Sequence, residues 1–123
     1  MEKFVITKNA NDEFQFYFID KNEDIILRSS GYTRKFMCEK GVESVKTNSQ
    51  DSNKFFKKTI SDDKVYFNLK AFNGKIIGMS KMYEDRISRD KGMEFLREKA
   101  PDAPIEDQTK SSEKLIKTSS LVC

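Results

Sequence analysis

The chain has 123 residues, of which 37% are hydrophobic, 35% charged and 11% aromatic, and its formal net charge is +3. This length holds one compact domain or two very small ones, and the composition is that of an ordinary globular protein. No apolar run is long enough to span a membrane, and the opening Met-Glu-Lys-Phe-Val does not begin a signal peptide, so we expect a cytoplasmic protein. Histidine is absent, which excludes Ser-His and Cys-His catalytic pairs.

The two cysteines, Cys38 and Cys123, are too few for a disulfide framework and do not have metal-ligand spacing. Cys38 lies in a helical pattern, where we expect a small buried hydrophobic residue. Cys123 is the last residue, whereas a prenylation motif needs its cysteine four positions from the end. We therefore expect no metal site and no cofactor.

Residues recur along the chain at a constant spacing of 51 positions, without any gap. The matching pairs are Lys3 and Lys54, Phe4 and Phe55, Asp12 and Asp63, Phe16 and Phe67, Asn22 and Asn73, Ile25 and Ile76, Ile26 and Ile77, Ser29 and Ser80, Tyr32 and Tyr83, Lys40 and Lys91, Gly41 and Gly92, Glu43 and Glu94, and Asp51 and Asp102. Such self-similarity indicates an internal duplication, with repeats over residues 1–51 and 52–102 and a tail over residues 103–123. A unit of about 50 residues without disulfides is marginal by itself, so we expect the repeats to share one core.

The first repeat begins with three runs of strand character: Lys3–Thr7, Glu13–Ile19 and Asp24–Arg28. In the second run Phe14, Phe16 and Phe18 alternate with other residues, which places three phenylalanines on one face of a strand. The period then changes to about 3.6 residues, which predicts a helix. Thr33 is its expected N-cap, and it ends near Thr47.

The second repeat has the same order, with strand runs over Lys54–Ile60, Val65–Lys70 and Lys75–Met79. Its helix is expected over Asp85–Lys99, because Pro101 disfavours helical backbone angles at Ala100. Each helix has a glycine in its interior, Gly41 or Gly92, at a cost of about 1 kcal/mol relative to alanine. We therefore expect each helix to pack on the sheet so closely that a Cβ would not fit.

Two pairs of residues mark the turns and the starts of the helices. Asn73-Gly74 is the strongest two-residue hairpin signal, because a type I′ turn needs positive φ at both positions. The first repeat has Asn22-Glu23 there, and glutamate at positive φ has a steric cost, so we expect a looser loop. Tyr32 and Tyr83 precede the helices, and we expect each ring to pack under its helix and each hydroxyl to hydrogen-bond a turn, with ligand binding as the alternative role.

Each repeat thus has the order β-β-β-α. Two such units side by side predict an α+β fold, with an antiparallel sheet of about six strands and both helices against one face. The tail is rich in Ser, Thr and Lys and has few large hydrophobic residues, so we expect residues 103–123 to be disordered.

Four short motifs resemble a known family: Asn73–Ser80 (NGKIIGMS), Ser30–Tyr32 (SGY), Lys40–Lys46 (KGVESVK) and Lys99–Ala103 (KAPDA). In this order they are similar to the YegP-like family of small bacterial proteins, also called DUF1508 or UPF0339. The resemblance covers residues 1–103 and both repeats. It implies a tandem-repeat internal pseudo-dimer, monomeric as a chain. It implies no activity, because none is established for the family.

The chain departs from the family pattern at three places. Glu23 replaces the turn glycine of the first repeat, and Ser49-Gln50 stands where Ala-Pro is usual. In the second repeat Met93–Leu96 (MEFL) replaces Ile-Glu-Ser-Val. These departures loosen the resemblance without breaking it.

The carboxylates do not indicate a catalytic pair. We expect the acidic pairs Asp62-Asp63, Glu84-Asp85 and Glu106-Asp107 to be turn, helix-start and tail charges. No glycine-rich phosphate loop is present. We therefore expect a non-enzymatic protein without catalytic residues, acting as a protein-interaction or structural module whose sheet edges could accept a further strand.

The alternative function is nucleic-acid binding through the second repeat, which has 12 basic and 8 acidic residues against 8 and 9 in the first. The candidate binding residues are Lys57, Lys58, Tyr66, Lys70 and Lys75. The period of two places Tyr66 and Lys70 on the strand face opposite Phe67, where they could hold phosphates and stack bases. A solvated charged surface is the competing interpretation of these lysines.

Overall fold

The structure is a computed structural model that describes residues 1–109. Its elements are β1 (Lys3–Lys8), β2 (Phe14–Ile19), β3 (Ile25–Arg28), α1 (Lys35–Asn48), a 3₁₀ turn (Ser52–Lys54), β4 (Phe55–Ser61), β5 (Lys64–Lys70), β6 (Ile76–Ser80), α2 (Arg86–Lys99) and β7 (Ile105–Asp107). Six strands and two helices thus form in the predicted order. The predictions for residues 110–123, including Cys123, lie outside the described residues.

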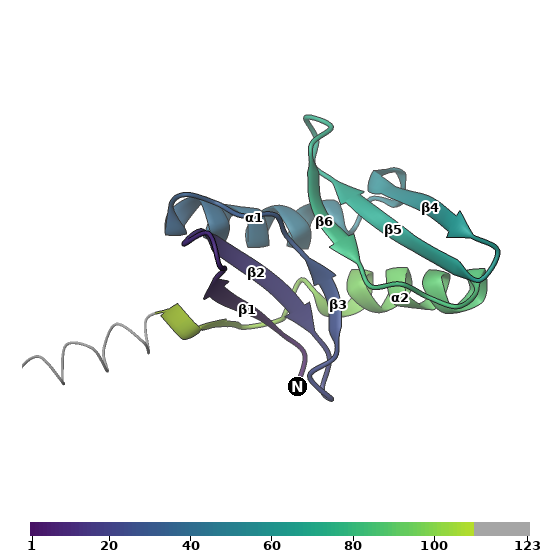
Figure 1. Ribbon diagram of the computed structural model, residues 1–123, viewed down its shortest axis with the longest axis horizontal. Helices are drawn as coiled ribbons and strands as arrows, with labels where there is room; N and C mark the ends of the chain where they lie inside the picture. Colours follow the sequence, from purple (N-terminus) through teal and green to yellow (C-terminus); the bar gives the residue numbers. More distant parts are fainter. Residues whose placement is uncertain (110–123) are drawn as a thin grey trace, which may run out of the picture.

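The strands form one sheet in the order β4-β5-β6-β3-β2-β1-β7. All neighbours are antiparallel except β1 and β7, and the two repeats meet where β3 pairs with β6. Both helices cover one face of this sheet (Figure 1). The predicted α+β pseudo-dimer is therefore confirmed, and the two repeats are joined through one continuous sheet.

The seventh strand was not predicted. Ile105–Asp107 pairs in parallel with β1, and Phe4 N–H donates to Pro104 O at 2.9 Å. The neighbouring Ala103 is buried. The prediction of a disordered tail is thus wrong for residues 105–107, because backbone pairing compensates for their low hydrophobicity.

The core lies between the sheet and the helices. Phe4, Phe16, Phe18 and Phe67 are fully buried, as the period of two predicts for the phenylalanines of β2. The ring of Phe18 lies 6.1 Å from that of Phe95, so α2 of the second repeat packs on β2 of the first. This contact shows that the repeats share a core, as their small size requires.

Both helix glycines are places of close approach. A Cβ at Gly41 would lie 2.5 Å from the Tyr32 hydroxyl oxygen, and one at Gly92 would overlap the Tyr83 hydroxyl oxygen. The predicted close packing is confirmed, and the group that requires it is the tyrosine ring under each helix. The predicted hydrogen bond to a turn is not formed by Tyr83: its hydroxyl oxygen is buried without a partner among residues 1–109.

The predicted N-cap of α1 needs correction. The N-cap of α1 is Arg34, one residue after Thr33, and its side chain makes no capping hydrogen bond. By contrast, Asp85 caps α2 by accepting from Ser88 N–H at 2.7 Å. The capping position is thus the same in both repeats, but only the second has a side chain that can accept there.

The hairpin at Glu23 is not looser than its counterpart. Glu23 has φ 66° and Gly74 has φ 83°, and both N–H groups donate to the residue three positions earlier. The Asp20 carboxylate accepts from Asn22 N–H and Asp24 N–H, which holds the first turn in shape. The same turn therefore forms with glutamate, at the cost of a strained backbone.

Candidate functional site

The face of the sheet opposite the helices, here called the open face, is crossed by one row of residues in register. From β4 to β7 this row is Phe56, Asn68, Met79, Arg28, Tyr17, Val5 and Glu106. Lys58 pairs with Tyr66 in the next row. Tyr66 and Lys70 lie on this face and Phe67 on the other, as predicted.

The structure brings together three of the five predicted binding residues. Lys58, Tyr66 and Lys70 are on the open face, where the Lys70 ammonium lies 4.1 Å from the centroid of the Phe56 ring. Lys75 is exposed in the β5–β6 turn. Lys57 pairs with Phe67 and therefore points to the helix-covered side, where its Nζ lies 3.4 Å from Asp90.

The open face also carries Arg28 and Phe56, which were not among the predicted binding residues. Arg28 comes from the first repeat and is brought beside Met79 by the pairing of β3 with β6. Phe56 is 38% exposed although it is a large hydrophobic residue at a strand centre. The Phe55-Phe56 pair was a possible signal, because in an alternating strand only one of two adjacent phenylalanines can face the core.

Asn68 lies on the open face, on β5, one strand in from the free edge of β4. It is only 6% exposed, and its Oδ1 is buried without a hydrogen-bond partner in the described part of the chain. A buried amide oxygen without a donor is costly, by about 1–3 kcal/mol. This acceptor lies between Phe56 and Met79 in the row across the sheet.

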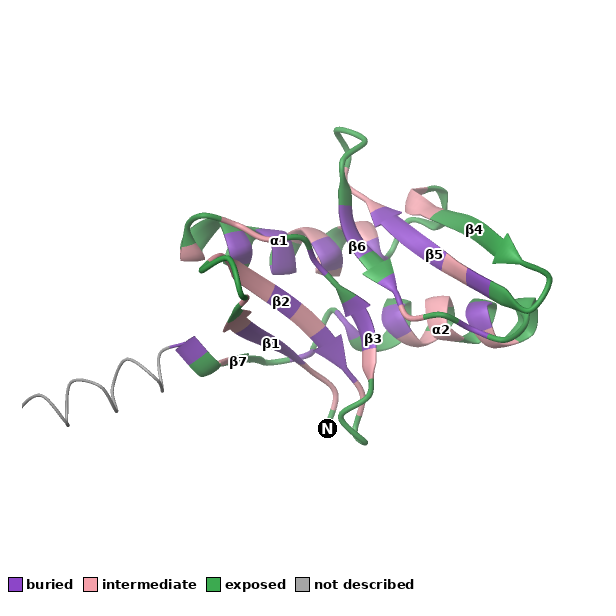
Figure 2. Ribbon diagram, viewed as in Figure 1, coloured by how far each residue is buried: buried purple, intermediate pink, exposed green. Residues whose placement is uncertain are grey.

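The second candidate is the outer edge of β4. Within residues 1–109 this strand has β5 as its one neighbour, whereas β1, at the corresponding place in the first repeat, lies between β2 and β7. Figure 2 shows β4 exposed along nearly its whole length, beside the mostly buried β5. An exposed strand edge is a site where another chain can add a strand.

The backbone groups of Lys57 and Thr59 point outward from this edge. Phe67 N–H donates to Ser80 Oγ at 2.9 Å, and Val65 N–H donates to Tyr83 O at 3.0 Å, so both are directed away from β4. In an antiparallel pair, directly opposite residues direct their backbone groups both toward or both away from each other. Their partners Lys57 and Thr59 therefore present N–H and C=O groups to the outside.

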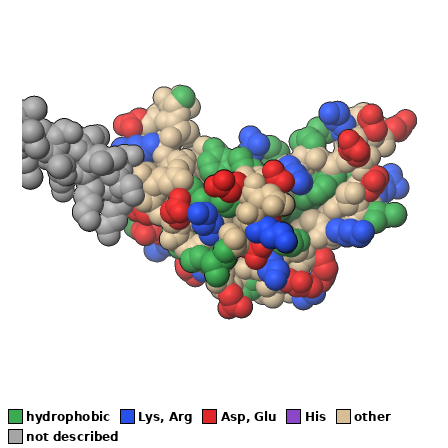
Figure 3. Space-filling model, turned by 90° about the horizontal axis from the view of Figure 1, so that it is seen from below, with side chains coloured by type: hydrophobic (Ala, Val, Ile, Leu, Met, Phe, Trp, Pro, Cys, Tyr) green, Lys and Arg blue, Asp and Glu red, His purple; other side chains and the backbone are tan. Residues whose placement is uncertain are grey.

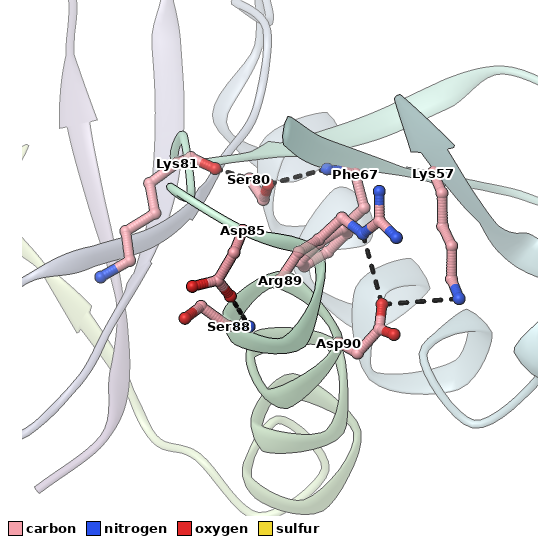
Figure 4. A network of polar contacts seen from close by, with 8 residues as sticks. All are labelled: Lys57, Phe67, Ser80, Lys81, Asp85, Ser88, Arg89 and Asp90. Carbon is pink, nitrogen blue, oxygen red and sulfur yellow. Dashed lines mark hydrogen bonds and ion pairs between the residues drawn. The ribbon is translucent and has the colours of Figure 1, made fainter. Parts of the chain in front are cut away.

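A groove of about 350 Å³ lies between the end of β4 and the start of α2. Its lining residues are Thr59, Ser61, Asp62, Val65, Asp85, Arg86 and Ile87. Next to it, Asp90 lies between Lys57 of β4 and Arg89 of α2, with Arg89 Nε 3.3 Å from the same carboxylate oxygen (Figure 4). Arg89 is only 5% exposed, so a cation is buried beside the free edge.

The described residues offer little for catalysis. No three carboxylates, cysteines or histidines of residues 1–109 come close enough to hold a metal ion. Burial raises the pKa of the Cys38 thiol to about 12, which leaves it protonated and unreactive at neutral pH. Neither helix is long and apolar enough to cross a bilayer.

Comparisons with known proteins agree with the fold. The model of the "Domain of unknown function (DUF1508)" family matches twice, over residues 9–55 and 61–107. A UPF0339 protein of Shewanella oneidensis is 40% identical over 106 residues, which are 86% of this chain and 96% of that protein. The UPF0339 protein YegP of Escherichia coli is 39% identical over 106 residues, with the same coverage of both chains.

Two solved structures share the architecture. The solution structure of Escherichia coli YegP, described as a protein of unknown function, superposes with a TM-score of 0.81 at 37% identity and covers 87% of this chain and 92% of its own. The Shewanella oneidensis UPF0339 structure has the same TM-score at 39% identity and covers 86% of this chain and 90% of its own. The chain therefore belongs to the DUF1508, or UPF0339, family of uncharacterised bacterial proteins, in its tandem-repeat form.

Proposed function

We propose that the protein is a non-enzymatic protein-binding module, monomeric and cytoplasmic, that accepts an extended segment of a partner at the outer edge of β4. The observation that carries this proposal is the difference between the two ends of the sheet. β1 and β4 correspond in the duplication, yet β1 has an outer neighbour and β4 has none among the described residues. Strand addition supplies affinity through backbone hydrogen bonds, and Lys57 and Thr59 present the groups that it needs.

The absence of histidine and the raised pKa of Cys38 support a function without catalysis. The acidic pairs support it as well: Asp85 is used as a helix cap, and Glu106 and Asp107 bind Lys3 and Lys35. These three carboxylates are therefore engaged in contacts that hold the fold, and Asp85 shares the groove beside β4 with Asp62.

The test is a tagged pull-down from the protein's own cell lysate, comparing the wild type with Thr59→Pro and Thr59→Ala. Proline at this outward-facing edge position removes one N–H donor without removing a β4–β5 hydrogen bond, so the fold is retained. Alanine changes the side chain and keeps the donor. We expect a nuclease-resistant protein partner that is captured by the wild type and Thr59→Ala and lost with Thr59→Pro. Equal capture by all three would contradict binding at this edge.

A second candidate function is binding of single-stranded nucleic acid on the open face. The observation that favours it is the pairing of Lys58 with Tyr66, beside the exposed Phe56 ring under Lys70. Lysines and aromatic rings on a sheet hold phosphates and stack bases. Figure 3 views the molecule from a side at right angles to Figure 1, and basic and acidic side chains are interspersed over the described surface seen there.

This second candidate is tested by fluorescence anisotropy with a labelled single-stranded oligonucleotide at two salt concentrations. Lys58→Glu should weaken salt-sensitive binding, because Lys58 is on the open face. Lys57→Glu is the matched control, since the adjacent side chain lies on the helix-covered side. Equal effects of both substitutions, or no binding by the wild type, would rule out the open face as a nucleic-acid site.

A further inference from the structure

The first repeat shows how a strand is held at the outer edge of this sheet. In β7 the residues Ile105, Glu106 and Asp107 pair in parallel with Phe4, Val5 and Ile6 of β1. Two ion pairs fix this strand to the repeat: Lys3 Nζ to Glu106 at 2.8 Å, and Lys35 Nζ to Asp107 at 2.5 Å. One cation comes from the edge strand and the other from the first turn of α1.

Both cations are repeated at the corresponding positions of the second repeat, 51 residues later. Lys54 stands at the position of Lys3, directly before β4, and Arg86 stands at the position of Lys35, in the first turn of α2. Neither Lys54 nor Arg86 has a carboxylate partner within residues 1–109. Lys54 lies 5.2 Å from the Phe72 ring, and Arg86 is exposed in the groove beside β4.

The free edge carries further positive charge where the occupied edge is apolar. Ile6 and Cys38, both fully buried, correspond to Lys57 and Arg89. These two cations share the Asp90 carboxylate, and Asp85, the N-cap of α2, accepts a hydrogen bond from Ser88 N–H. The edge of β4 therefore has four basic side chains in positions that would face an added strand or flank it.

We propose that the segment accepted by β4 is acidic and runs parallel to it, with a hydrophobic residue followed by two acidic ones, as Ile-Glu-Asp does in β7. This inference rests on the proposed function and specifies its ligand. The hydrophobic residue would lie opposite Phe55, the first acid would reach Lys54, and the second acid would reach Arg86. In the first repeat, Phe4 N–H donates to Pro104 O. In the second repeat the corresponding N–H, that of Phe55, donates to Ser52 O. The added segment therefore needs no residue at the position of Pro104 and can begin at the position of Ile105.

The occupant is a segment of a partner protein and not a second copy of this chain. The chain's own Ile-Glu-Asp segment is engaged on β1 by two ion pairs and three register positions. A second copy could donate it only by giving up those contacts.

The test is fluorescence anisotropy of a labelled peptide with the sequence PDAPIEDQT, that of residues 101–109, titrated with the full-length protein. We expect binding that weakens with salt, and a loss of affinity of about tenfold in Lys54→Glu/Arg86→Glu, as two lost ion pairs would cause. Lys91→Glu, an exposed position on α2 outside the groove, is the matched control and should bind like the wild type.

Two further measurements separate the proposals. A peptide in which Glu and Asp are replaced by Gln and Asn should bind about tenfold more weakly. Lys57→Pro removes the outward N–H that lies within the register of the Ile-Glu-Asp segment. If the uncharged peptide binds equally well and Lys57→Pro abolishes binding of both peptides, strand addition stands and the acidic preference is overturned. If neither peptide binds and sedimentation shows self-association that Lys57→Pro removes, the occupant is a second copy and the inference of an acidic partner is wrong.

Discussion

Removal of the Tyr83 hydroxyl should stabilise the protein, although Tyr→Phe substitutions commonly do the opposite. Tyr83 is 9% exposed, and its hydroxyl oxygen is buried without a hydrogen-bond partner among the described residues. A buried unsatisfied polar group costs about 1–3 kcal/mol. The oxygen also contacts the helix at Gly92, but losing a few atom contacts costs only about 0.1–0.2 kcal/mol each.

Tyr83→Phe should therefore raise the free energy of unfolding by about 1–2 kcal/mol. In a chain of 123 residues each 1 kcal/mol corresponds to a rise in melting temperature of roughly 4 °C. Urea denaturation followed by circular dichroism measures the change, because the chain has no tryptophan to report by fluorescence. Tyr32→Phe is the control, since no buried unpartnered oxygen is found at Tyr32, and it should bring no such gain. A Tyr83→Phe protein less stable by 1 kcal/mol or more would refute the reasoning and show that the hydroxyl has a partner.

Three other predictions concern stability and are checked by the same denaturation assay. Glu23→Gly should stabilise the protein by about 1 kcal/mol, because glycine adopts the positive φ of the first hairpin without steric strain. Gly74→Ala should destabilise the protein for the same reason. No gain in stability with Glu23→Gly would show that the first turn is unstrained. Gly92→Ala should destabilise by about 1–3 kcal/mol despite the better helix propensity of alanine, because the new methyl group overlaps Tyr83; a more stable variant would contradict the close packing. The thiol of Cys38 has its pKa raised by burial from 9.0 to about 12, so the unfolded chain loses this proton first and stability should fall as the pH rises from about 9 to about 12. Cys38→Ala should fall less over that range, and identical pH profiles would contradict the burial of the thiol.

The strands β1 to β6 and both helices could be predicted from local signals, namely alternating phenylalanines, short strand-like runs and the 3.6-residue pattern, which recur in the same order 51 residues later. The strand β7 has no such signal. Ile105-Glu106-Asp107 contains one hydrophobic residue, and its pairing depends on Lys3 and Lys35, which lie about 70 to 100 positions earlier in the chain. Contacts of this range cannot be seen in a local pattern.

The candidate sites show the same limit. Tyr66 and Lys70 follow from the alternation of β5, but Lys57 and Lys58 lie in FFKKTIS, where no alternation separates the two faces. Only the register with β5 shows that Lys58 joins Tyr66 and that Lys57 faces Asp90. The free edge of β4 likewise becomes visible only by comparison with β1, once β7 is placed.

The most direct test of strand addition at β4 is a titration of the isotopically labelled protein with the acidic peptide PDAPIEDQT, followed by the backbone amide resonances. The account predicts the largest shift at Lys57, whose outward N–H lies within the register of the Ile-Glu-Asp segment, with smaller shifts at Thr59, Lys54 and Arg86. Shifts centred on Lys58, Tyr66 and Lys70, or a spectrum unchanged at saturating peptide, would contradict it.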